Sequence, residues 1–349
     1  MNISGKILIF QTAFIGDVIL TLSMVQLLKK RYPIVEIDFV ATKRASDVLQ
    51  NHPDINEIII YDKYGDDKGR KGFKRLTNLL KSKKYDAAIV PHRSIRSALL
   101  IYLSKIKTRI GFNRSAGRIL FTHIVKYRYD LHEAERNISL LKPLLIETQK
   151  KELPRLYPSI ADKKVVDKIL FEEEILDTNR LIGIAPGSVW NTKRWTKEGY
   201  LQLVRKLLSE KYVVCLLGGK EDVKLCNEII NNTSIGGVIN LAGKLTLLQS
   251  AELIRRCRVL ITNDSSPVHL AAAVDIPVVA IFGATVPAFG FGPFSEGSIV
   301  VEINDLKCRP CAIHGGNICP IGTFDCMKRI THEMVFEKVM SAFNRKLGR

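Results

Sequence analysis

The 349-residue sequence contains no hydrophobic run of transmembrane length. No stretch approaches the roughly 18 consecutive apolar residues that suggest a helix spanning a bilayer. The apolar start from Ile7 to Ile15 is interrupted by Gly16 and Asp17, and no small-residue cleavage site follows it. We therefore expect a cytoplasmic protein, whose contact with the cytoplasmic face of the inner membrane would be peripheral and made through basic residues.

Two common nucleotide-binding motifs are also missing. The segment after the first predicted strand reads QTAFIGDV, which contains neither G-x-G-x-x-G nor the phosphate loop G-x-x-x-x-G-K-[ST]. This argues against a nicotinamide-dependent dehydrogenase and against a P-loop ATPase.

Acidic residues are few in comparison with basic ones. The chain has 35 Asp and Glu against 53 Lys and Arg, a formal net charge of +18 and a pI near 9.6. Such an excess favours an anionic partner, although an organism whose proteins are generally rich in lysine would show the same composition. The basic runs Lys68–Arg75 and Lys81–Lys84 lack interleaved aromatic residues, so we do not expect nucleic acid to be that partner.

Short apolar runs alternate with segments of helical periodicity in two series, one on each side of a looser, charged stretch. Such alternation predicts parallel sheets wound by right-handed crossovers. We predict an acceptor-binding domain at 1–155, a linker at 156–180, a donor-binding domain at 181–330, and a terminal helix at 331–349 that packs back on the first domain. The predicted strands are Lys6–Gln11, Glu36–Val40, Glu57–Tyr61, Asp86–Val90 and Arg109–Phe112, then Leu181–Ala185, Tyr212–Leu217, Val238–Leu241, Val259–Thr262 and Pro277–Phe282.

Several polar segments follow predicted strands, at the edge where ligands bind in such sheets. Asp17 follows the first strand and reads either as a helix cap or as a functional carboxylate. Ser188 lies in a Gly-Ser turn shortly before Lys193, which suits a diphosphate but is also compatible with an ordinary surface turn. Farther along, TNDSSPVH predicts a helix capped by Ser266, whose amino end would attract an anion.

Four of the seven cysteines, Cys308, Cys311, Cys319 and Cys326, form a C-x2-C-x7-C-x6-C cluster. Such a cluster is typical of a structural zinc site, although adjacent prolines and the spacing do not match a standard zinc ribbon. A thiol-rich loop near the ligand site is the alternative. No histidine placement singles out a catalytic cysteine.

The chain resembles the heptosyltransferases of glycosyltransferase family 9. The resemblance rests on KILIFQTAFIGDVILT, APGSVWNTKRW, LAGKLTLLQSAELIRRCRVLITNDSSPVHLAAA and PVVAIFGATVP, in that order, together with the terminal cysteine pattern. It implies an α/β fold of the GT-B type, in which two doubly wound Rossmann-like domains face a central cleft. It also implies an inverting, metal-independent transfer of heptose from ADP-heptose to the inner core of lipopolysaccharide, an anionic, lipid-linked acceptor.

The resemblance carries specific roles onto this sequence. It makes Asp17 the catalytic base. Independently of the resemblance, Arg93 and Arg96 follow one predicted strand and Arg109 and Arg114 flank another, so these basic residues form a candidate wall for an anionic acceptor. No cofactor is expected for catalysis. The donor-binding residues that it implies are Ser188, Lys193, Glu221, Asp264, Ser265, Ser266 and His269.

Two departures from the family pattern leave alternatives open. Ser266 replaces a usual glycine, and Thr285-Val286-Pro287 stands where the family has a T-D-P segment. A transferase of the same fold that uses another nucleotide sugar for O-antigen or surface glycan is therefore a second hypothesis. A non-enzymatic, basic zinc- and nucleic-acid-binding protein is a remote third.

Overall fold

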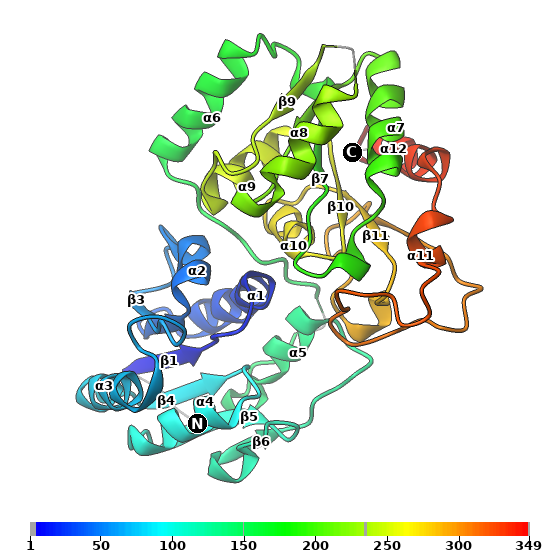
Figure 1. The fold of residues 1–349 in the computed structure, drawn as a ribbon. Coiled ribbons are helices and arrows are strands. Elements are labelled where there is room, and N and C mark those ends of the chain that lie inside the picture. The colour runs from blue at the N-terminus through cyan, green and yellow to red at the C-terminus, as the bar shows by residue number, and fades with distance from the viewer. Residues whose placement is uncertain (1–4, 149, 234–235, 348–349) are drawn as a thin grey trace. The chain divides into compact units, whose positions relative to one another are not determined.

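The computed structural model describes residues 5–148, 150–233 and 236–347. It divides into two compact units, Met1–Tyr157 and Pro158–Arg349 (Figure 1). Within the described part of the chain, no helix has both the length and the apolar character needed to cross a membrane.

The first unit is built on a six-stranded sheet in which every neighbouring pair is parallel. The strand order is β3-β2-β1-β4-β5-β6, so successive strands run outward from β1 in one direction and then from β4 in the other. The crevice beyond the carboxyl ends of the two central strands is where such doubly wound sheets bind ligands. The strands are β1 (Lys6–Phe10), β2 (Glu36–Ala41), β3 (Glu57–Ile60), β4 (Ala87–Val90), β5 (Thr108–Phe112) and β6 (His123–Val125).

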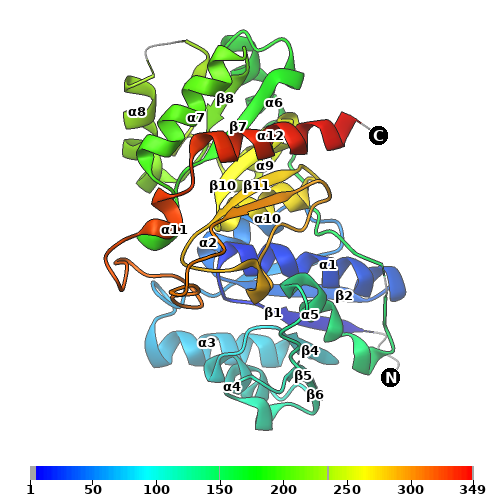
Figure 2. The same ribbon diagram turned by 90° about the vertical axis from the view of Figure 1, so that its right-hand side faces the viewer.

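Helices cover both faces of this sheet (Figure 2). Helix α1 (Ile15–Arg31) packs against α5 (Glu133–Ser139) on one face, and α2 (Lys43–Ser46) is a single turn after β2. Helices α3 (Gly69–Ser82) and α4 (Ile95–Leu103) pack side by side on the other face, over a core that includes Leu8, Val90 and Leu100. Because both faces are covered, the central strands are apolar on both sides and fully buried, as parallel sheets require.

The second unit repeats the same winding. Its strand order, β12-β11-β10-β7-β8-β9, places β7 and β10 at the centre, in the positions that β1 and β4 occupy in the first unit. All neighbouring strands are again parallel. The strands are β7 (Leu181–Ala185), β8 (Val213–Leu216), β9 (Val238–Asn240), β10 (Val259–Asn263), β11 (Val278–Phe282) and β12 (Ile299–Glu302).

Two helices of the second unit differ from the sequence prediction. One was not predicted as a helix, and the other was predicted to pack elsewhere. Helix α6 (Ile160–Glu172) lies inside the predicted linker and packs against α9. Helix α12 (His332–Leu347), predicted to pack back on the first domain, packs against α7 and strands β10 to β12 of its own unit. The remaining helices are α7 (Lys197–Ser209), α8 (Val223–Asn231), α9 (Leu247–Arg256), α10 (Ser266–Ala273) and the short α11 (Asp325–Lys328).

Candidate active site

Asp17 lies at the carboxyl end of β1, in the first turn of α1. It is the third helical residue, and Phe14 is the N-cap. The Asp17 carboxylate accepts a hydrogen bond from the Phe14 amide at 3.2 Å, which is the return half of a capping box. Asp17 is therefore not the cap itself, although its carboxylate helps to start the helix. The Phe14 amide engages one oxygen, Oδ2, so the other, Oδ1, can take part in chemistry without loss of this hydrogen bond.

The surroundings of Asp17 favour its protonated form. Burial raises the pKa of Asp17 to about 7, and the negative charge of Glu133 acts in the same direction. The Phe14 amide and the positive charge of Arg93 oppose the rise in pKa. The side chain keeps part of its surface accessible. A carboxylate with a pKa near neutrality is well suited to accept a proton at physiological pH.

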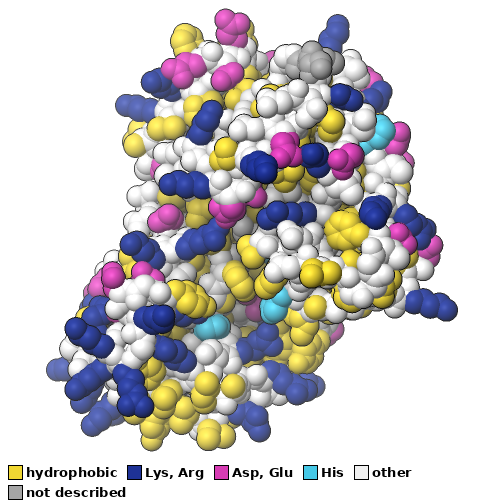
Figure 3. All heavy atoms as spheres, viewed as in Figure 1, with side chains coloured by type: hydrophobic (Ala, Val, Ile, Leu, Met, Phe, Trp, Pro, Cys, Tyr) yellow, Lys and Arg dark blue, Asp and Glu magenta, His cyan; other side chains and the backbone are white. Residues whose placement is uncertain are grey.

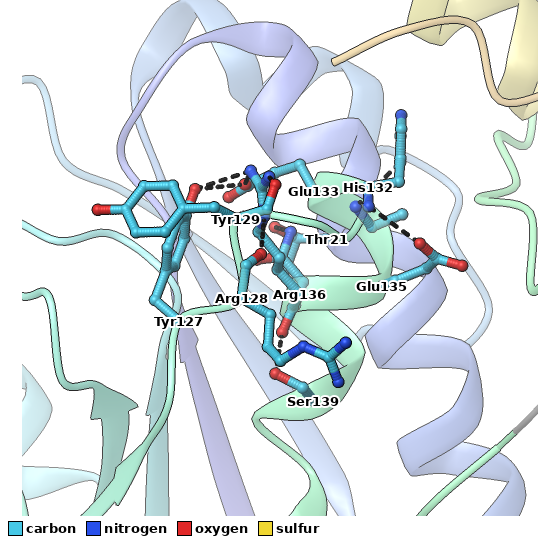
Figure 4. A network of polar contacts seen from close by, with 11 residues as sticks. Thr21, Tyr127, Arg128, Tyr129, His132, Glu133, Glu135, Arg136 and Ser139 are labelled. Atoms are coloured by element: carbon cyan, nitrogen blue, oxygen red, sulfur yellow. Dashed lines mark hydrogen bonds and ion pairs between the residues drawn. The ribbon is translucent and has the colours of Figure 1, made fainter. Parts of the chain in front are cut away.

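A buried polar network fixes the charge of Glu133 next to α1 (Figure 4). Glu133 accepts hydrogen bonds from the Tyr127 hydroxyl at 3.0 Å and from the Arg136 guanidinium at 2.9 Å. Arg136 is 1% exposed and also donates to the backbone carbonyls of Arg128 and Tyr129. Since each buried charge has its partners, the network is a rigid support rather than a source of instability.

The same helix pair is tied together directly at Asp17. The Thr21 hydroxyl donates to the Asp17 carbonyl at 2.8 Å, and the Asn137 side-chain amide donates to the Thr21 hydroxyl at 3.3 Å. Helix α5 thus holds the first turn of α1 in place. This contribution of α5 was missed by the sequence analysis, which assigned no element to that segment.

Two of the four predicted acceptor arginines lie exposed at this edge of the sheet. Arg93 follows β4 and its guanidinium lies 4.5 Å from the centre of the Tyr127 ring, and Arg114 follows β5 and lies 5.8 Å from the Tyr129 ring. Stacking on an aromatic face orients a guanidinium while leaving its N–H groups free for an anion. Arg93 and Arg114 are therefore suited to hold a carboxylate or phosphate near Asp17.

The other two predicted arginines serve the fold instead. Arg109 lies near the beginning of β5, far along the strand from its carboxyl end, and donates to the backbone carbonyls of Leu120 and Ile106. Arg96 donates to the Tyr61 hydroxyl at 2.7 Å and to the Gly69 carbonyl at 3.2 Å. The guanidinium groups of Arg96 and Arg109 are thus engaged by Tyr61 and by backbone carbonyls, whereas those of Arg93 and Arg114 stack on tyrosine rings. The position of an arginine beside a predicted strand could not reveal which acceptors its guanidinium N–H groups bind in the folded protein.

His92 is a further polar residue at this edge that the sequence analysis did not single out. Its Nδ1 lies 3.1 Å from the Thr12 hydroxyl and 2.8 Å from the Ser97 hydroxyl. Burial, together with the positive charges of Lys63 and Arg93, lowers the pKa of His92 to about 4. A neutral imidazole at pH 7 makes His92 a positioning group for the loop after β1 rather than a source of charge.

In the second unit, the central feature is an ion pair at the carboxyl end of β10. The Lys193 ammonium lies 2.6 Å from Asp264 Oδ2, and the Thr285 hydroxyl donates to the same oxygen at 2.6 Å. Both charged side chains are largely buried, with 14% and 9% of their surfaces exposed. Sequence analysis predicted Lys193 and Asp264 separately. It could not predict that they pair, or that Thr285, which precedes the departure from the family pattern at Val286, contributes the third contact.

The turn after β7 is held against β10 by one buried side chain. Asn263 donates to the Pro186 carbonyl at 2.8 Å and accepts from the Trp195 amide at 2.9 Å and the Tyr200 hydroxyl at 3.0 Å. Ser188, at the end of this turn, is 9% exposed, and its carbonyl accepts a hydrogen bond from the Arg194 guanidinium. The turn is therefore rigid before any ligand binds, as a preorganised anion site requires.

Helix α10 begins beside this turn with its amino end uncapped by a side chain. The structure makes Ser265 the N-cap, with Ser266 and Pro267 as the first two helical residues, so the prediction that Ser266 is the cap was wrong by one residue. The Ser265 side chain makes no cap hydrogen bond to the first turn, and its hydroxyl is directed at the Gly187 and Asn263 carbonyls instead. The positive end of the helix dipole is thus left for an anion.

The last two predicted donor residues differ in their surroundings. His269 is 5% exposed, and burial together with the charge of Lys193 lowers its pKa to about 4. Its Nδ1 has no hydrogen-bond partner within the described residues, so the ring is a neutral group with one unused polar atom. Glu221 is exposed on the 3₁₀ helix η6 (Lys220–Asp222), after β8. It is at the correct edge of the sheet for a ribose contact, but outside the Lys193–Asp264 cluster.

The cysteine-rich segment packs against the same site. Arg309, between Cys308 and Pro310, donates to the Thr285 carbonyl and to the Glu302 carboxylate, both at 2.8 Å. The Thr192 amide donates to the Gly316 carbonyl at 3.0 Å, and Gly315 adopts a positive φ of 80°, where a β-carbon would lie 3.1 Å from Lys193 Cγ. The segment therefore positions both partners of Asp264.

The structure lends no support to the prediction of a structural zinc site. Among the described residues, no group of three or more His, Cys, Asp or Glu side chains is arranged to hold a metal ion. The four cysteines are free thiols, with Cys326 buried and the other three partly exposed. The alternative reading, a thiol-rich loop close to the ligand site, agrees with the contacts of Arg309 and Gly316.

Comparison with known proteins gives likeness over nearly the whole chain. The sequence model of glycosyltransferase family 9 (heptosyltransferase) matches residues 73–316. Lipopolysaccharide heptosyltransferase 2 of Salmonella typhimurium is 31% identical over 310 residues, which cover 85% of this chain and 88% of that protein. The structure of E. coli ADP-heptose lps heptosyltransferase II matches with a TM-score of 0.78 and 27% identity, over 98% of this chain and 99% of the other. A glycosyl transferase family 9 protein from Veillonella parvula matches with a TM-score of 0.89 at 23% identity, over 99% of both chains.

Proposed function

This chain belongs to glycosyltransferase family 9, the heptosyltransferases, and we propose that it transfers heptose from ADP-heptose to the inner core of lipopolysaccharide. Its similarity to lipopolysaccharide heptosyltransferases supports the sugar and the acceptor class. The observation that carries the proposal is the pair of preorganised sites at equivalent positions of two identically wound sheets. One offers a carboxylate of raised pKa and the other a buried cation at an uncapped helix end.

In the first unit, Asp17 would act as the general base. An acceptor hydroxyl placed at its accessible oxygen loses its proton to the carboxylate as the oxygen attacks the anomeric carbon of the donor. Arg93 and Arg114, each stacked on a tyrosine ring, would hold the anionic groups of the acceptor. Attack from the face opposite the leaving nucleotide inverts the anomeric configuration.

In the second unit, the diphosphate of the donor would lie at the amino end of α10. The Ser188 turn, the first amides of α10 and Lys193 would meet the negative charge that develops on the departing phosphate. Asp264 and Thr285 hold the ammonium group so that it does not reorganise during the reaction. Fixed positive charge of this kind supplies the stabilisation that a metal ion provides in other transferases, so we propose a metal-independent reaction.

Two alternatives remain from the sequence. A transferase that uses another nucleotide sugar would have the same two sites, and the serine at position 266 and the valine at position 286 are where its donor preference would differ. The non-enzymatic zinc- and nucleic-acid-binding hypothesis is not supported, because the family consists of glycosyltransferases.

A donor panel separates the first two hypotheses. We expect ADP-heptose to raise the unfolding temperature more than ADP-, UDP-, GDP- or CMP-linked sugars that lack heptose, since a ligand at a hundredfold excess over its Kd stabilises by about 2.7 kcal/mol. Mass spectrometry of core-truncated lipopolysaccharide incubated with each donor, in the presence of a chelator, should show addition of one heptose with ADP-heptose alone. Stronger stabilisation and sugar addition with another donor would replace heptose in the proposal.

A further inference from the structure

The outer face of helix α4 carries an exposed hydrophobic stripe. Ile95, Leu99, Tyr102 and Leu103 are all among the exposed large hydrophobic residues. Their spacing of four, three and one residues places them on one side of the helix, opposite the buried Leu100 and Ile101. The buried inner face of α4 packs on the core of the first unit. Nothing in the described part of the first unit covers the outer face of the helix.

The stripe continues over two neighbouring elements. Ile119, which is 84% exposed, lies on the 3₁₀ helix η2 (Arg118–Leu120), and η2 packs so closely on α4 that a β-carbon at Gly117 would lie 2.4 Å from that of Ala98. Ile124 on β6 is in register with Gly111 of β5, which is in register with Val90, a residue of the core under α4. Ile124 therefore projects on the same side of the sheet as α4. The α4 face is defined here as Ile95, Leu99, Tyr102, Leu103, Ile119 and Ile124.

The region around the α4 face is almost entirely basic. Residues 68–129, which run from one residue before α3 to four residues after β6, contain 17 Lys and Arg and a single acid, Asp86, a net +16 out of +18 for the whole chain. Arg118 is exposed on η2, and Lys105, Lys107 and Lys126 are exposed in the segments that directly follow α4 and β6. Figure 3 shows hydrophobic side chains gathered at the lower edge of the first unit, with Lys and Arg over α3 beside them.

We propose that the α4 face docks on an anionic lipid bilayer. An apolar stripe with a basic surround is the composition that binds at the boundary between headgroups and acyl chains, with basic side chains on the lipid phosphates. A nucleic acid would instead require polar and aromatic contacts at the centre of the patch, where five of the six side chains are aliphatic. A second copy of the chain would bring two basic rims together in a symmetric pair, which like charges oppose.

This inference goes beyond the proposed reaction and does not depend on it. The α4 face contains neither Asp17 nor a candidate donor residue, so docking and transfer are separable functions. Docking would hold the first unit close to a lipid-linked acceptor, which raises the acceptor's effective concentration without adding a contact to the transferred sugar.

The test is co-sedimentation of the full chain with vesicles of zwitterionic phosphatidylcholine, with and without about one third anionic phosphatidylglycerol. We expect binding to the anionic vesicles only, and weaker binding as salt is raised. Leu99→Ser with Leu103→Ser, and separately Lys107→Glu with Arg118→Glu, should each reduce partitioning at least tenfold. Phe171→Ser with Leu176→Ser, which removes side chains of the second unit that are 80% and 92% exposed, should leave partitioning unchanged.

Other outcomes would overturn the proposal. They are equal binding to both vesicle types, absence of binding, unchanged binding of the α4-face variants, or a concentration-dependent dimer that the Leu99/Leu103 variant loses. We expect every variant to fold, because all six substituted side chains are exposed. Urea unfolding checks this expectation. Transfer to a deacylated, water-soluble acceptor should be the same for the Leu99/Leu103 variant and the unmodified chain, and a loss there would assign the face to the active site instead.

Discussion

Asp17→Asn should lower kcat for heptose transfer by at least 10²–10⁴-fold, the usual contribution of a general base. The asparagine amide keeps the shape of the side chain, and its oxygen still accepts the Phe14 amide that starts α1. What it loses is the ability to take a proton. KM for the donor should change little, because Asp17 belongs to the first unit and the candidate donor contacts belong to the second. Steady-state kinetics with saturating donor measure both quantities.

The same substitution should make the protein more stable above neutral pH. The folded-state pKa of Asp17 is about 7, above its unfolded value near 3.8, so the folded state binds the proton more tightly. Stability therefore falls as pH rises between these two values, and above pH 7 the ionised carboxylate costs at most about 4 kcal/mol, less because the side chain keeps some contact with water. Asparagine removes that cost. A higher urea midpoint at pH 8, and little change at pH 4, is the expected result.

A matched control is available in the second unit. Asp162 has the same position in a capping box at the start of α6, where its carboxylate accepts the Ser159 amide at 2.9 Å. Asp162→Asn repeats the chemical change at a helix start that has no proposed role in transfer. It should leave kcat unchanged. If both variants lost activity equally, or if Asp17→Asn retained near-full activity, Asp17 could not be the base.

Lys193→Met should impair both folding and donor binding. Among the described residues, the substitution leaves the Thr285 hydroxyl as the side-chain partner of the largely buried Asp264 carboxylate. Removing one member of a buried ion pair costs about 3–5 kcal/mol. It also removes the cation proposed to face the diphosphate. We expect a lower urea midpoint together with a loss of detectable ADP-heptose binding by calorimetry.

A second substitution separates the two effects. Adding Asp264→Asn to Lys193→Met removes the uncompensated charge, so stability should return towards that of the unmodified chain. Donor affinity should not return if Lys193 contacts phosphate. Lys197→Met provides a control at the exposed pair with Glu228, which contributes little to stability, so the urea midpoint and donor binding should both be nearly unaffected. Recovery of donor binding in the double variant would make the Lys193–Asp264 pair a structural feature only.

The sequence was sufficient to predict the fold class and the membership of the family. Ten of the twelve strands that the structure describes were predicted, because buried parallel strands read as short apolar runs. The missed strands, β6 and β12, are three and four residues long at sheet edges and have no distinctive pattern. Helix α6 was read as linker because few of its residues are buried, although its Ser159–Asp162 capping box was visible in the sequence.

Candidate site residues could be named from the sequence, but their contacts could not. Asp17, Lys193 and Asp264 were singled out because they come after predicted strands and match the family pattern, and their roles in transfer stay predictions. Their partners could not be named, because Glu133, Thr285 and Arg309 reach these residues through tertiary packing across tens of residues. For the same reason, the sequence could not show that the Arg109 guanidinium donates to backbone carbonyls, because only folding brings these carbonyls near it.

The pH dependence of kcat/KM for the acceptor tests the central claim most directly. With Asp17 as the base, the rate should rise tenfold per pH unit on the acidic side and level off above an apparent pKa near 7. The residual activity of Asp17→Asn should lack this rise, while that of Asp162→Asn should retain it. An acidic limb that persists in the Asp17 variant would show that another group accepts the proton.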